Sequence, residues 1–183
     1  MERRLIGPEK QLLEPIFKNM VPYNSIKCKI NTLEVGGPYN SITPAGHPMF
    51  SKFVYCNDFT KAALQDQWVF FHEFTHVWQW HHDIRPVVSA IGIFISKAAD
   101  YLSAYPYTVA PGDKFSDFNI EQQAAIVADY WYMAMKKQKP LNNTNPKATV
   151  ADYADVMKQF QLAGPPVNPL DDDFLGGGKK SGW

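Results

Sequence analysis

Hydrophobic and polar positions follow two different periods along the chain. Residues 25–35, SIKCKINTLEV, alternate polar and apolar side chains with the period of two that is typical of a half-buried strand. Residues 41–55 indicate one or two further strands around a turn at residues 44–46. The other apolar positions recur with helical spacing, which predicts helices over residues 5–20, 61–82, 87–105, 119–138 and 149–162.

Capping residues mark the start of two of these helices. Asp58 precedes the helix at residues 61–82, and Asn119 opens the helix at residues 119–138, so both are predicted N-caps. Short strands followed by helices indicate an α+β fold that is mainly helical, with a small N-terminal antiparallel or mixed sheet. We expect one domain over residues 1–164 and a flexible tail over residues 165–183, which are rich in Pro, Gly and charge.

The composition argues against two classes of partner. Lys and Arg number 18 and so do Asp and Glu, so there is no basic field that would hold nucleic acid. The longest apolar run, residues 86–96, is about half the length of a membrane span, and no Sec-type signal is visible at the N-terminus. We therefore expect no nucleic acid and no membrane span. The pattern leaves open whether Cys28 and Cys56 pair.

The helix predicted over residues 61–82 contains the sequence His-Glu-Phe-Thr-His at positions 72–76. Histidines four residues apart lie on one helix face, so both imidazoles can reach one metal ion. Zinc accepts such nitrogens, and a catalytic zinc keeps one position for water, whose pKa it lowers from about 15.7 to near 7. We predict that His72 and His76 bind one Zn²⁺ ion and that Glu73 is the general base.

A motif of three fixed positions also arises by chance, and paired histidines often lie without metal on a solvated helix face. The flanking residues favour the metal site. Aromatic and aliphatic side chains at residues 68–71 and 77–78 make this helix apolar on nearly all sides, so it is predicted to be buried. Buried histidines and a buried glutamate need partners, because leaving them unpaired is costly.

A catalytic zinc needs a third protein ligand. Glu121 fits best, because it lies in the first turn of an otherwise apolar helix, where an isolated charge is costly and the helix dipole favours a carboxylate. Asp129 lies two turns further along roughly the same face. It is predicted to orient a ligand imidazole without binding the metal itself. The alternative for Glu121 is that it only caps its helix. The other candidates are His47, His81, His82 and the two cysteines.

Stabilisation of an oxyanion is the role for which the sequence offers several candidates. Tyr105, Tyr107 and His82 each carry a hydrogen-bond donor that can serve it. It is equally open that the tyrosines pack in the core, and that His81 and His82 only benefit from the C-terminal end of their helix. His47 lies in a turn, where a lone histidine is usually a surface residue.

Three separated segments resemble a known family. VFFHEFTHVWQ, the upstream ITPAGHPMF and NDF, and the downstream FNIEQQAAIVADY are similar to the zincin-like metallopeptidase effector domains associated with VgrG spike proteins of type VI secretion. The resemblance implies a zincin-like fold with a small sheet packed on the HExxH helix, and an acidic zinc ligand at Glu121.

The same resemblance carries expectations about biology. It implies an antibacterial toxin, made in the bacterial cytoplasm without a Sec signal and secreted by a type VI system into the periplasm of a recipient cell. The expected partners are a VgrG spike and a cognate immunity protein.

Three functions follow from these observations. The first is hydrolysis of a peptide bond in a protein or peptide substrate by a zinc metallopeptidase. The second keeps zinc and water but cleaves an amide in peptidoglycan crosslinks, which the motif does not exclude. The third is a zincin-shaped binding module without turnover. Such a module is expected to lack the base or a ligand, whereas His72, Glu73 and His76 are all present.

Overall fold

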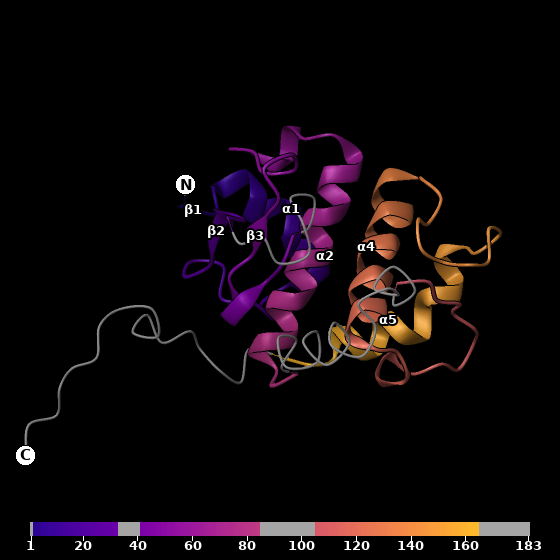
Figure 1. The fold of residues 1–183 in the computed structure, drawn as a ribbon. Helices are drawn as coiled ribbons and strands as arrows, with labels where there is room; N and C mark the ends of the chain where they lie inside the picture. The colour runs from indigo at the N-terminus through magenta and orange to yellow at the C-terminus, as the bar shows by residue number, and fades with distance from the viewer. Residues whose placement is uncertain (1, 33–40, 85–104, 165–183) are drawn as a thin grey trace, which may run out of the picture.

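The computed structural model describes residues 2–32, 41–84 and 105–164. Figure 1 shows a small sheet beside the long helix α2 (Leu64–His81), with α4 (Ile120–Lys136) and α5 (Ala154–Gln161) on the other side of α2. Two predicted elements lie outside the described residues, namely the helix at residues 87–105, except for its last residue, and the tail at residues 165–183.

The strands form a three-stranded mixed sheet. β1 (Glu2–Arg4) pairs antiparallel with β2 (Lys27–Ile30), and β2 pairs in parallel with β3 (Met49–Phe50). The α+β class and the mixed sheet are therefore confirmed. The sequence pattern does not predict β1, whose three residues become a strand through pairing with β2. The predicted turn is the 3-10 turn η1 (Pro44–Gly46).

α2 and α4 lie side by side and run antiparallel. Trp68, near the start of α2, donates a hydrogen bond to Asp129, whereas Gln79, near its end, donates to the carbonyl of Ile120 at the start of α4. The ring of Phe71 in α2 also stacks on that of Trp131 in α4, with centroids 4.2 Å apart. This pairing brings the first turn of α4 beside the middle of α2.

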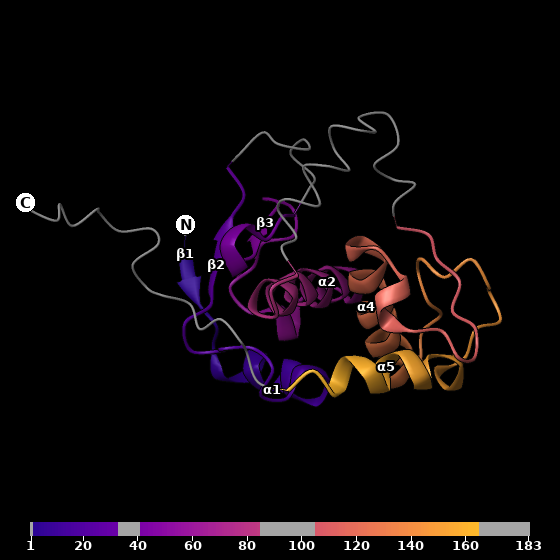
Figure 2. The ribbon, with the colours of Figure 1, turned by 90° about the horizontal axis from the view of Figure 1, so that it is seen from below.

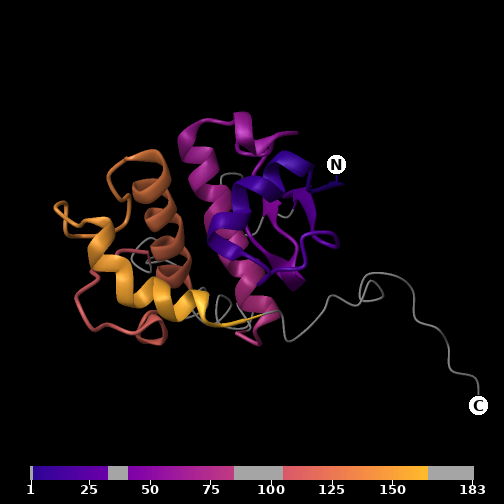
Figure 3. The same ribbon diagram turned by 180° about the vertical axis from the view of Figure 1, so that it is seen from behind.

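α1 (Gly7–Phe17) and α5 form a second layer on one side of α2 and α4 (Figures 2 and 3). Their C-terminal ends meet, because the ring of Phe17 packs edge-on against that of Phe160 at 5.8 Å and Lys18 donates to Gln161 at 3.2 Å. Both helices match predicted ones, although the first turn of the last predicted helix is the 3-10 turn η5 (Val150–Tyr153).

α2 is buried along most of its length, as its apolar flanks predict. Phe70 of α2 packs against Phe50 of β3 at 5.9 Å and against Phe59 at 4.4 Å, so the sheet lies on the HExxH helix. Aromatic side chains from both layers fill the core around α2. They include Phe17, Phe50, Phe59, Phe70, Phe71, Phe74, Trp131 and Phe160. Among the described helices, none has the length and hydropathy that crossing a bilayer requires.

The two predicted N-caps have different outcomes. Asn119 caps α4, because its Oδ1 accepts hydrogen bonds from the backbone N–H groups of Glu121 and Gln122 at 2.9 Å each. The prediction for Asp58 is wrong. It caps the 3-10 turn η2 (Phe59–Lys61), since it accepts from the N–H of Thr60 at 3.0 Å. Two extended residues then separate η2 from α2, which begins without a side-chain cap.

The cysteines do not pair, since Cys28 and Cys56 are both free thiols. The segment around Cys56 is tied to the N-terminus by Arg3, which donates to the Cys56 carbonyl at 2.9 Å and forms an ion pair with Glu9 at 2.6 Å. Glu9 is fully buried and also accepts from the N–H of Phe59 at 3.0 Å. A buried charge with such partners is well satisfied, so this contact is structural.

Candidate metal centre

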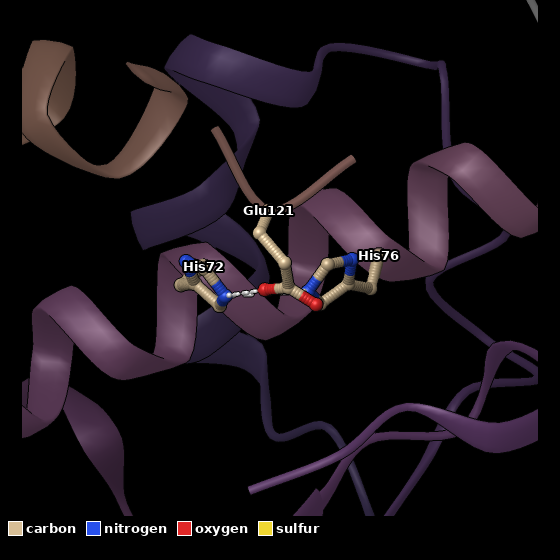
Figure 4. Close-up of side chains that lie close together, drawn as sticks. All are labelled: His72, His76 and Glu121. Atoms are coloured by element: carbon tan, nitrogen blue, oxygen red, sulfur yellow. Dashed lines mark hydrogen bonds and ion pairs between the residues drawn. The ribbon is translucent and has the colours of Figure 1, made fainter. Parts of the chain in front are cut away.

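Three side chains converge at the interface between α2 and α4 (Figure 4). His72 and His76 come from successive turns of α2, and Glu121 comes from the first turn of α4. The helical period places both imidazoles on the α4 side, and the Asn119 cap fixes where α4 begins and therefore where Glu121 lies. All three side chains are buried.

The atoms that would bind a metal form a nearly equilateral triangle. Oε2 of Glu121 lies 3.2 Å from Nε2 of His72 and 3.3 Å from Nε2 of His76, and the two Nε2 atoms are 3.2 Å apart. A tetrahedral metal with ligands at about 2.0–2.1 Å holds neighbouring ligand atoms about 3.3–3.4 Å apart. The group therefore fits one metal ion with three protein ligands.

Gln79 sets the tautomer of His76. The amide nitrogen of Gln79 donates to the Ile120 carbonyl and to Oε1 of Gln123, at 2.9 Å each, so its oxygen faces His76. That oxygen accepts a hydrogen bond from Nδ1 of His76 at 2.7 Å. Because Nδ1 is the donor, neutral His76 keeps its lone pair on Nε2, the nitrogen that belongs to the triangle.

The imidazole of His72 packs against two aromatic rings. Trp68 stacks on its imidazole with centroids 5.2 Å apart and 27° between the planes, and the ring of Tyr105 lies 5.6 Å away. Its Nδ1 is buried and has no hydrogen-bond partner among residues 2–32, 41–84 and 105–164. Packing against two rings restricts rotation of this imidazole, whereas a hydrogen bond fixes that of His76.

The expectation that Asp129 orients a ligand imidazole directly is wrong. Asp129 follows Glu121 by eight positions, which is about 12 Å along α4. Its hydrogen bond with Trp68 sets it level with that residue, one turn before His72. It reaches His72 only through Trp68. The carboxylate is fully buried. It accepts hydrogen bonds from Trp68 Nε1, Tyr107 OH and the backbone N–H groups of Leu141 and Asn142, at 2.8, 2.7, 2.8 and 3.0 Å.

The cluster shifts the pKa values of its members in opposite directions. Burial acts to raise the pKa of Glu121, but the charge of His76 and hydrogen bonds with both imidazoles hold it well below its ordinary value. Burial acts to lower the pKa of His76, but Glu121 outweighs it and raises that pKa to about 9. Without metal, the pair is therefore an imidazolium beside a carboxylate.

Glu73 is hydrogen-bonded by Thr43, which lies between β2 and β3 in the chain. The hydroxyl of Thr43 donates to Oε2 of Glu73 at 2.7 Å and lies 3.3 Å from the Glu73 carbonyl. Both side chains are buried. Burial raises the pKa of Glu73, against the opposing effects of the two imidazoles and of the hydrogen bond from Thr43. A raised pKa suits a carboxylate that accepts a proton and later releases it.

Comparison with known proteins adds to this geometry. The chain is 30% identical over 162 residues to the type VI secretion system spike protein VgrG2b of Pseudomonas aeruginosa, a match that covers 86% of this chain and 15% of the relative. The solved structure of the effector domain of that VgrG2b superposes with a TM-score of 0.66 at 29% identity, over 84% of this chain and 83% of the other. The chain is a homologue of this effector domain. No protein-family model matches it.

The match covers the effector domain of VgrG2b and a small part of the whole spike protein. The match to the solved domain extends over most of both chains, so it concerns the effector part of VgrG2b. The chain spans only 15% of the whole spike protein. The expected link to VgrG effectors is therefore supported for the domain.

The candidates for oxyanion stabilisation lie in different places. Tyr105 is close to the cluster, through its ring contact with His72. The hydroxyl of Tyr107 is buried and bonded to Asp129 and Tyr153 at 2.7 Å each, so it belongs to the core network. His82 stacks on Trp78, and its ring nitrogens lie 2.8 Å and 3.3 Å from the carbonyls of Trp78 and Gly164. The structure therefore brings only Tyr105 to the cluster.

Two further histidines lie apart from the triangle. His81 is fully buried at the end of α2, next to Gly46. His47 accepts a hydrogen bond from the N–H of Lys27 at 3.3 Å, and burial together with the nearby lysines lowers its pKa. His47 is thus a structural contact of the sheet, and Glu121 is the residue that completes the group.

Three residues that contact the site were not predicted from the sequence. Gln79 follows His76 by three positions, and Trp68 precedes His72 by four, so the helical neighbour rule could have identified both. Thr43 lies 30 residues before Glu73 and on another element. No local pattern indicates that contact.

Proposed function

We propose that this protein is a zinc-dependent peptidase and acts as an effector of a type VI secretion system. The observation that carries the proposal is the buried triangle of His72, His76 and Glu121 with Glu73 beside it. Two imidazoles and one carboxylate are a donor set that suits a catalytic zinc. Homology to the VgrG2b effector domain supports the effector role.

The residues have distinct roles in peptide hydrolysis. Zn²⁺ bound by the triangle would lower the pKa of water to near 7 and polarise the substrate carbonyl. Glu73 takes a proton from the attacking water and passes it to the nitrogen of the leaving amine as the C–N bond breaks. His72, His76 and Glu121 hold the ion, and Gln79 keeps His76 in the tautomer that can bind it.

The proposal also covers the substrate, the carrier and the immunity protein. We expect a protein or peptide substrate in the periplasm of a recipient bacterium, a VgrG spike as carrier and an immunity protein in the producing cell. Support comes from the similarity to a spike protein of a type VI system.

The deciding experiment measures zinc content and hydrolysis of labelled casein together. Glu73→Gln is expected to stay folded and keep zinc while turnover falls by about 10² to 10⁴-fold, because the amide cannot accept the proton. Glu121→Ala is the matched variant. Its zinc affinity is expected to fall by more than the roughly 10- to 100-fold that follows loss of a residue that only orients a metal ligand.

Two results would change the assignment. Full activity in a folded, zinc-loaded Glu73→Gln protein would overturn the mechanism. Release of crosslink fragments from purified peptidoglycan without cleavage of casein would replace the peptidase by an amidase that uses the same residues.

A further inference from the structure

The hydrogen bond between Thr43 and Glu73 joins the catalytic base to a part of the chain that has no role in metal binding. Thr43 Oγ1 donates to Glu73 Oε2 at 2.7 Å, and both side chains are buried. Charge-assisted bonds of this kind are stronger than neutral ones. The bond uses one carboxylate oxygen and leaves the other, Oε1, for the proton of the attacking water.

The position of Thr43 is determined on its N-terminal side by the sheet. Its neighbour Ile42 forms a two-bond bridge with Met49, with N–H to carbonyl distances of 2.9 Å and 2.7 Å. Met49 belongs to β3, whose next residue, Phe50, packs in the core against Phe70 of α2. Thr43 is therefore attached to a rigid part of the molecule.

On its C-terminal side, Thr43 is held by the close approach of η1 to α2. Gly46 has φ +72°, and a Cβ added there would lie 2.8 Å from Cδ1 of Trp80 and 3.2 Å from Nε2 of His81. Only glycine allows η1 to lie this close to α2 in this conformation. The contact presses the turn onto the C-terminal part of the same helix that carries Glu73.

We propose that Thr43 is a positioning residue for Glu73, fixed by the Ile42–Met49 bridge and by Gly46. This inference rests on the proposed function, since it assigns a partner to the base of that reaction. The hydroxyl has one proton and two lone pairs. It donates to Oε2 of Glu73, which stays a hydrogen-bond acceptor when Oε1 takes the proton of the water, so the same bond persists in both states. Glu73 therefore keeps one position while a proton arrives and leaves.

The alternative is that Thr43 only satisfies a buried carboxylate. A structural contact of that kind would contribute to stability without any specific effect on the chemical step. The positioning role predicts a fall in kcat with KM and zinc affinity unchanged, because Thr43 forms its hydrogen bonds with the base and with none of the three residues of the triangle. Displacement of a catalytic group by about 1 Å costs about 10²-fold in rate.

The first test compares Thr43→Val with Thr43→Ser in the full chain. Valine keeps the shape and removes the hydroxyl, whereas serine keeps the hydroxyl. We expect kcat for casein to fall by about 10- to 100-fold in Thr43→Val, with KM and zinc affinity as in the wild type, and to be largely restored in Thr43→Ser. Wild-type kcat in Thr43→Val, or a parallel loss of zinc affinity, would overturn the proposal. If Thr43→Val does not fold, Thr43→Ala takes its place.

The second test does not depend on turnover and separates this proposal from the proposed function. A double-mutant cycle of Thr43→Val and Glu73→Ala is measured by urea unfolding of the zinc-free protein. A hydrogen bond to a charged group predicts coupling of about tenfold or more in the unfolding equilibrium constant. If the two substitutions are coupled but the protein cleaves no substrate, the hydrogen bond between Thr43 and Glu73 is supported and the proposed peptidase activity is rejected. Additive effects of the two substitutions would overturn the positioning role.

Discussion

Gln79 provides the sharpest test of how the metal site is organised. Replacement by leucine removes the oxygen that accepts the proton of His76 Nδ1 at 2.7 Å. Free rotation and the other tautomer then become accessible to this imidazole, and Nδ1 is left buried without an acceptor. Loss of a residue that orients a metal ligand typically weakens metal binding by about 10- to 100-fold, which corresponds to about 1.4–2.8 kcal/mol.

A matched control exists on the same helix. Gln67 is also a buried glutamine, and its amide donates to backbone carbonyls, those of Ala62 at 2.9 Å and Thr60 at 3.4 Å. Gln67→Leu is expected to lower the free energy of unfolding, as Gln79→Leu does, by about 1–3 kcal/mol for unsatisfied buried groups. It should leave zinc affinity unchanged.

The assay is a titration of each protein with zinc in competition with a coloured chelator, alongside urea unfolding without metal. Weakened zinc binding in Gln79→Leu alone would support the tautomer argument. Two results would refute it: wild-type zinc affinity in Gln79→Leu, or equal weakening in both variants, which would mean that the effect comes from general loss of stability.

The remaining predictions concern compartment and pH. Expressed in bacteria with an added periplasmic signal, the protein should harm the cell, and Glu73→Gln should not. Harm confined to cytosolic expression would place the target in the cytosol. Harmlessness in both compartments, with zinc bound, would contradict the effector role. In the zinc-free protein, pairing with Glu121 raises the pKa of His76 from 6.5 to about 9. Its stabilising contribution is therefore fully present below about pH 6.5 and is lost as the pH rises through about 9. Zinc must displace that proton, so its affinity should rise over the same range, and urea unfolding with and without chelator checks both signs.

The parts of the fold that the sequence predicts are those in which local pattern and burial agree. The helix around residues 72–76 is apolar on nearly every side, and the structure buries it between the sheet and α4. Asn119 has both the side chain and the position of an N-cap, and it fixes Glu121 in the first turn of α4. Local signals therefore point to the three residues that the structure brings together as a candidate metal site.

Non-local contacts account for the parts that the sequence does not predict. β1 exists only through its pairing with β2, so three residues without a strong pattern give no signal of their own. Asp129 lies on the same face of α4 as Glu121, but the antiparallel packing sets it level with Trp68 instead of an imidazole. Asp58 satisfies cap chemistry, yet η2 ends before α2 begins. For Asp129 and Asp58, the residue type was interpreted correctly and the partner was not.

The polar residues of α2 bear on the choice between an enzyme and a silent binding module. His72, Glu73, His76 and Gln79 are all buried on this helix. All four have partners from other elements: Glu121 for the two histidines, Thr43 for the base and Ile120 for the glutamine. A metal held only for structure needs the imidazoles and the carboxylate of Glu121, but it does not need Glu73. Burial raises the pKa of Glu73, so keeping it ionised there costs stability. Since an apolar side chain would fill the same space without that cost, a buried base with its own hydrogen-bond donor argues for turnover.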